Sequence, residues 1–141
     1  MDLKKSPKRA FELFALAAAQ GHAIAQNSLG LCYNDGEGVK INFKTAAQWY
    51  RRAADQRFPL AQYNLGSMFY KGKGVAQSFD EAVRWYRLAA AQGDADALYN
   101  LGLCYASGCP DGTGVQINHK TAAQWYQRAA EQGYPRAQYN L

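Results

Sequence analysis

AQYNLGSMFYKGKGVAQSFDEAVRWYRLAAAQ, residues 61–92, is the stretch that decides the fold, because most of the chain repeats it. Within it Ala61 stands four residues before Leu65. The same pair recurs as Ala25 and Leu29, as Ala97 and Leu101, and as Ala137 and Leu141. The step between copies is 36 residues, except that four extra residues, 109–112, lengthen the last step to 40. A fixed period of this size indicates a solenoid or a propeller, in which each unit buries its apolar face against its neighbours.

Two helices are predicted in each unit. The second helix starts at a residue type that caps helix N-termini, and this holds in every copy, at Ser6, Asn42, Ser78 and Asn118. It runs for about 13 to 15 residues, as from Phe79 to Gln92, and ends at a glycine suited to a left-handed backbone, at Gly21, Gly93 or Gly133. Arg57 takes that place in one copy, so a slightly strained turn is predicted there.

The first helix of each unit begins almost at once, with Pro59, Pro135 or Asp94 at its start. It is predicted to close near Tyr33, Tyr70 or Ala106, before a Gly-x-Gly-Val turn. Ala61, Leu65, Gly66 and Phe69 share one helical face, and Gly66 lets a neighbouring helix come close. Because the connections are short, the helices pair in antiparallel fashion and the fold is all-α.

Composition and cysteine content indicate the cellular compartment in which the chain is expected. Its 141 residues contain no apolar run of about 18, so no membrane span is predicted. Lys4, Lys5, Lys8 and Arg9 precede an apolar segment as in a signal peptide, but residues 6–20 keep the register of the later second helices. Three cysteines without a paired framework favour a reducing compartment and hence the cytoplasm, although Cys104 and Cys109 are close enough in sequence that their pairing stays open.

The repeated pattern resembles a known family. A-x-x-x-L-G-x-x-[YF]-x-x-G-x-G-V followed by A-x-x-W-Y-x-x-A-A-x-x-G is similar to the Sel-like repeat (SLR) family, relatives of the tetratricopeptide repeats. The resemblance covers residues 1–141 as one array: a trailing second helix at 6–20, repeats at 21–56, 57–92 and 93–132, and a cut first helix at 133–141. The stop at Leu141, inside a helix, leads us to expect a piece of a longer array with end-to-end self-association.

The resemblance implies a right-handed αα superhelix whose first helices line a concave groove. It also implies a non-catalytic adaptor that binds a protein or an extended peptide segment there. The groove residues would be Asn27, Leu31, Asn34, Tyr63, Asn64, Ser67, Tyr70, Tyr99, Asn100 and Leu103. The amides of Asn64 and Asn100 can donate and accept at once, which suits a peptide backbone. Two alternatives stay open: these asparagines only bridge adjacent repeats, and the tyrosines only pack.

The residues give less support to other functions. A net charge of +5 raises nucleic acid as a partner, but the arginines fall on the second helices and the lysines in turns or at helix ends. A hydrolase would need a nucleophile beside a base, and no serine has a repeat-matched histidine. His22 and His119 have no matching ligand partners, so neither a metal nor a cofactor is predicted. The Gly-x-Gly segments lack the remainder of a phosphate loop.

Overall fold

A computed structural model describes residues 6–140, which form eight α-helices and no strand. The helices are α1 (Pro7–Ala19), α2 (Ala23–Asp35), α3 (Phe43–Ala54), α4 (Pro59–Lys71), α5 (Phe79–Ala91), α6 (Ala95–Ser107), α7 (His119–Glu131) and α8 (Pro135–Asn140). Lys4, Lys5 and Leu141, which entered the sequence predictions, lie outside the described residues.

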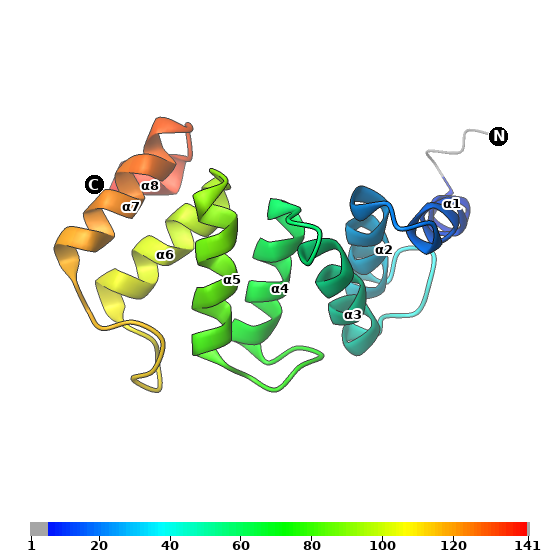
Figure 1. Cartoon of the computed structure of the whole chain (residues 1–141), viewed down its shortest axis with the longest axis horizontal. Coiled ribbons are helices and arrows are strands. Elements are labelled where there is room, and N and C mark those ends of the chain that lie inside the picture. The colour runs from blue at the N-terminus through cyan, green and yellow to red at the C-terminus, as the bar shows by residue number, and fades with distance from the viewer. Residues whose placement is uncertain (1–5, 141) are drawn as a thin grey trace.

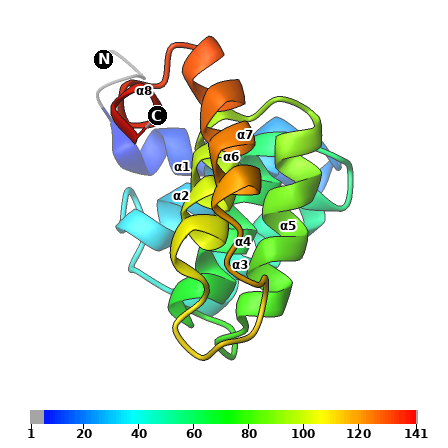
Figure 2. The ribbon, with the colours of Figure 1, turned by 90° about the vertical axis from the view of Figure 1, so that its left-hand side faces the viewer.

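The helices follow one another along the longest axis, and α1 and α8 lie at opposite ends of the array (Figure 1). Contacts run chiefly between helices that are consecutive in sequence, such as α4 with α5 and α5 with α6. Viewed from the end, the helices form two layers that wind about the axis (Figure 2). The architecture is a right-handed αα superhelix of antiparallel helix pairs, as predicted.

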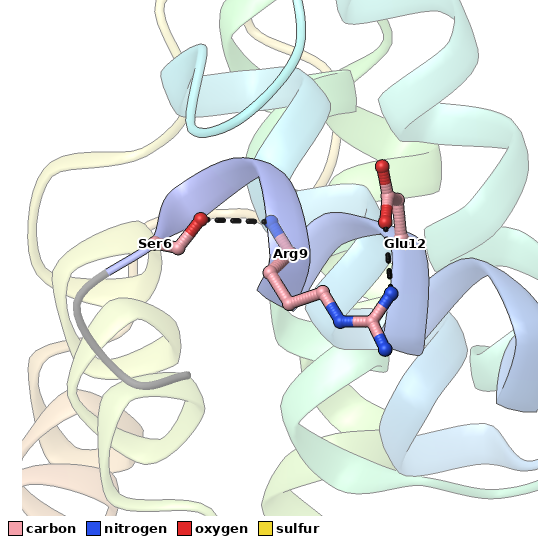
Figure 3. Close-up of polar contacts among 3 residues, drawn as sticks. All are labelled: Ser6, Arg9 and Glu12. Atoms are coloured by element: carbon pink, nitrogen blue, oxygen red, sulfur yellow. Dashed lines mark hydrogen bonds and ion pairs between the residues drawn. The ribbon is translucent and has the colours of Figure 1, made fainter. Parts of the chain in front are cut away.

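The predicted N-caps are confirmed at all four second helices. Ser6 accepts a hydrogen bond from the Arg9 backbone N–H at 3.3 Å, and the Arg9 guanidinium pairs with Glu12 at 3.2 Å (Figure 3). The side chains of Asn42, Ser78 and Asn118 accept in the same way from the third helical residue. Each cap satisfies one backbone donor that the first helical turn leaves unpaired.

The first helices run one or two residues further than predicted, to Asp35, Lys71 and Ser107. In α2 and α4 the stop is a left-handed glycine whose N–H returns to a carbonyl of the preceding turn, Gly36 to Cys32 and Gly72 to Met68. Such a cap lets the last polar residue before the glycine stay helical.

The core is a seam of small residues and large rings. An added Cβ on Gly66 would lie 2.9 Å from the Tyr86 ring and 3.2 Å from the Ala82 carbonyl oxygen, which confirms the predicted close approach. Gly30 meets Tyr50 and Gly102 meets Tyr126 in the same manner. Each glycine therefore admits the tyrosine of its own unit's second helix, at the helix-propensity cost that glycine carries.

Buried glutamines link neighbouring units, which the sequence analysis did not anticipate. The Gln26 side-chain amide donates to the Ala18 carbonyl, and its oxygen accepts from Gln56 at 2.7 Å. One unit later Gln62 and Gln92 repeat the arrangement, with Gln62 donating to Ala54 and accepting from Gln92 at 2.7 Å. These bonds compensate the burial of Gln26 and Gln62.

The strained turn at Arg57 is confirmed, because its φ of +65° is the one positive value at a described residue other than glycine. The equivalent positions hold Gly21, Gly93 and Gly133. We therefore expect Arg57→Gly to stabilise the fold by about 1 kcal/mol, since a side chain in this backbone region costs roughly that much. Thermal unfolding followed by circular dichroism measures the change. A lower midpoint for Arg57→Gly would contradict the strain.

Candidate protein-binding site

A hollow of about 220 Å³ opens between α2 and α4. Five of the predicted groove residues line it: Leu31, Asn34, Tyr63, Asn64 and Ser67. Leu31 is 37% exposed, whereas the other four are half-buried. The hollow thus combines an apolar contact with amide and hydroxyl groups that can bond a polar ligand.

Asn27 is placed beneath this surface, where it is only 2% exposed. Its side-chain oxygen accepts a hydrogen bond from the Asn64 amide at 3.0 Å, which ties α2 to α4. Asn64 therefore bridges adjacent units, and a bridging role was one of the two alternatives left open by the sequence. The bond occupies one of the two amide N–H groups of Asn64, so the side chain keeps a further donor for a ligand.

Tyr63 connects three helices at the edge of the hollow. Its ring stacks on Tyr86 of α5 with centroids 5.6 Å apart, and its hydroxyl bonds with the side chains of Ser67 and of Asn100 on α6. Burial raises the pKa of Tyr63, and the Asp96 carboxylate adds to the rise, while the hydrogen bonds act in the opposite direction. Asn100 also donates to the Asp96 carbonyl of its own helix at 2.7 Å.

The remaining predicted residues do not line the hollow. Tyr70 packs edge-on against Phe79, with ring centroids 5.0 Å apart. Tyr99 lies between Tyr126 and Tyr134, at centroid distances of 5.7 and 5.0 Å. Leu103, on α6, is exposed and is the repeat equivalent of Leu31.

The sequence analysis missed four residues that line the hollow: Tyr50, Met68, Lys71 and Lys73. Tyr50 is buried on α3, and burial is the main cause that raises its pKa, ahead of the Asp35 carboxylate. Lys71 ends α4 and Lys73 follows in the turn. A comparison of the three Gly-x-Gly turns would have found both lysines, because only the middle copy carries them.

Four arginines of the second helices lie over aromatic rings. Arg52 lies 4.6 Å from the Trp49 ring centroid and Arg128 lies 5.1 Å from that of Trp125. Arg51 and Arg84 both face Trp85, at 5.9 and 5.7 Å. These cations therefore contribute to packing through cation–π contacts as well as to surface charge.

The three cysteines are buried free thiols. Cys104 and Cys109 lie in hydrogen-bond contact, and burial, together with the neighbouring Cys109, raises the pKa of Cys104 to about 12. Within residues 6–140 no three histidine, cysteine or acidic side chains gather in a way that could hold a metal ion. None of the helices in that part of the chain is long and apolar enough to cross a membrane.

Stacked helix pairs with a polar hollow between successive first helices define a helical-repeat solenoid. The family model of the Sel1 repeat matches residues 1–22, 23–58, 59–94 and 95–134. The chain belongs to the Sel1 repeat family, whose members are generally non-catalytic scaffolds for protein interactions. The family model starts its repeats at residues 23, 59 and 95, two residues later than the repeats predicted from the sequence at 21–56, 57–92 and 93–132. The predicted division of the chain into repeats stays a prediction.

Solved structures agree with this assignment. A Sel1 repeat protein from Oxalobacter formigenes is 39% identical with a TM-score of 0.86, and the match covers 96% of this chain and 54% of that one. A protective antigen of uropathogenic Escherichia coli strains that displays an SLR fold is 41% identical with a TM-score of 0.85, and the match covers 92% and 27%.

Cysteine rich protein B of Helicobacter pylori shares the fold at 21% identity, with a TM-score of 0.74 over 97% of this chain and 98% of its own. The chain thus spans only 54% and 27% of the two more similar proteins. No match to a curated protein was found.

Proposed function

We propose that this chain is an adaptor that binds an extended protein segment along α2, α4 and α6. The hollow between α2 and α4 is the observation that carries the proposal, since it gathers half of the predicted groove residues. It offers amide and hydroxyl groups for a peptide backbone beside the exposed Leu31 for an apolar side chain. Leu103 presents the same contact on α6.

The test must spare the residues that hold the units together. Loss of the Asn64 side chain would leave the buried Asn27 oxygen without its bond, so a binding defect there could not be separated from a folding defect. Leu31 and Leu103 are better targets, because they are 37% and 36% exposed. Leu88, on α5, is 43% exposed and serves as the matched control away from the hollow.

The experiment selects binders from a phage library of random peptides and measures the affinity of a selected peptide by fluorescence anisotropy. We expect Leu31→Gln with Leu103→Gln to weaken binding at least about tenfold, because apolar burial on the peptide is lost. Leu88→Gln should leave affinity unchanged. Equal binding by the groove variant, or loss with Leu88→Gln, would move the site to the second helices and overturn the proposal.

A further inference from the structure

The hollow between α2 and α4 carries an excess of positive charge. Lys71 and Lys73 are the two charged residues among its lining residues. The two ion pairs recorded within residues 6–140 involve other residues, Arg9 with Glu12 and Arg84 with Glu81. Lys73 places its ammonium 5.0 Å from the centroid of the Phe43 ring, which fixes the end of its side chain near α3.

The fold does not require lysine at these positions. The repeat equivalents of Lys71 and Lys73 are Asp35 and Glu37, which carry the opposite charge. Both helices nevertheless end in the same way, with cap φ and ψ of 74° and 33° at Gly36 and of 68° and 35° at Gly72. The negative end of the α4 dipole favours Lys71, yet α2 tolerates Asp35 in the corresponding place.

Three carboxylates lie near the hollow without lining it. Asp35 accepts a hydrogen bond from the Asn34 side chain at 2.7 Å. Asp96 on α6 and, more weakly, Asp94 at the start of that helix interact with Tyr63. Asp35 is thereby held by an amide, while Lys71 lines the hollow together with the half-buried residues Tyr63 and Ser67. An incoming anion would meet two ammonium groups and several neutral donors, an arrangement that gives short, charge-assisted hydrogen bonds.

From this charge distribution we infer that the hollow receives an Asp or Glu side chain of the bound protein segment, held by Lys71 and Lys73. The inference rests on the proposed function, because it names the chemistry of the segment that the same site binds. Asn64 and Ser67 line the same hollow and offer an amide and a hydroxyl to the polypeptide that carries the carboxylate. The partner is therefore an acidic segment in extended conformation.

The probe is again a phage-displayed library of random peptides, whose displayed peptides have no free C-terminal carboxylate. The wild-type chain should enrich peptides with Asp or Glu at one fixed position. For a selected peptide, Glu→Gln or Asp→Asn should weaken binding about five- to tenfold. Lys71→Gln with Lys73→Gln should weaken binding of the acidic peptide by a similar factor and leave the neutral peptide unaffected, which a double-mutant cycle measures.

Lys44→Gln with Lys120→Gln is the matched control, since both lysines are exposed on second helices. Enriched peptides without an acidic position, or acid preference that survives Lys71→Gln with Lys73→Gln, would overturn the inference. The proposed function would still stand if the leucine variants abolished enrichment. A labelled single-stranded oligonucleotide that loses affinity with the lysine variant, while acidic peptides do not, would assign the lysines to phosphate and also overturn it.

Discussion

Gly74→Ala is expected to destabilise the array by about 2 to 4 kcal/mol. The turn after α4 lies directly against the start of α3, so an added Cβ would stand 2.2 Å from the Phe43 carbonyl oxygen and 2.8 Å from the Lys44 nitrogen. Both are backbone atoms of a helical turn and cannot rotate away, and overpacking of this kind costs about 1–3 kcal/mol. The φ of +72° adds roughly 1 kcal/mol for any residue with a side chain.

Gly112→Ala separates these two costs. Gly112 has a similar φ of +77°, but a Cβ there would meet no atom within 4 Å. Gly112→Ala should therefore lower the free energy of unfolding by only about 1 kcal/mol. Urea unfolding followed by circular dichroism compares the two variants. Equal losses of stability would mean that the close approach of turn and helix contributes nothing.

Trp85→Ala is expected to cost about 3–5 kcal/mol, the range for removal of a large buried ring. Trp85 is 5% exposed, and the guanidinium groups of Arg51 and Arg84 lie 5.9 and 5.7 Å from the centroid of its ring. Its indole N–H has no hydrogen-bond partner among the described residues. The loss is therefore one of packing, and no hydrogen bond is removed.

Trp49 stands at the same repeat position but is only half-buried. Trp49→Ala should accordingly cost less than half as much as Trp85→Ala, measured by the same urea titration. If the two variants lost equal stability, burial would not be the source of the effect. The comparison holds residue type and repeat position constant.

The parts of the fold that could be predicted depend on local chemistry. Ser6, Asn42, Ser78 and Asn118 cap helices because a short polar side chain reaches its own first turn, whatever surrounds it. The stacking of the units could be predicted from the repeats, because a pattern that recurs at a fixed spacing indicates stacked units.

The candidate site was only partly predictable because its composition depends on distances between units. Alignment with related repeats indicated Leu31 and Ser67, which do line the hollow. It could not show that Asn27 would be buried under Asn64, since that depends on how closely α2 and α4 approach. Lys71 and Lys73 were treated as charges in a turn, and only the packed structure brings them to the hollow.

The glutamine links have a mechanical consequence. The side-chain amide of Gln56 donates to Gln26, and that of Gln92 donates to Gln62. The repeat equivalent of Gln26 and Gln62 in the next unit is Leu98, whose side chain cannot form a hydrogen bond. There Arg128 makes a longer bond of 3.5 Å to the Ala90 carbonyl. Directional bonds resist rotation between helices more than apolar contacts do. We therefore expect the array to flex most easily where α6 joins α5 and α7, so that the curvature of the array changes chiefly at this joint.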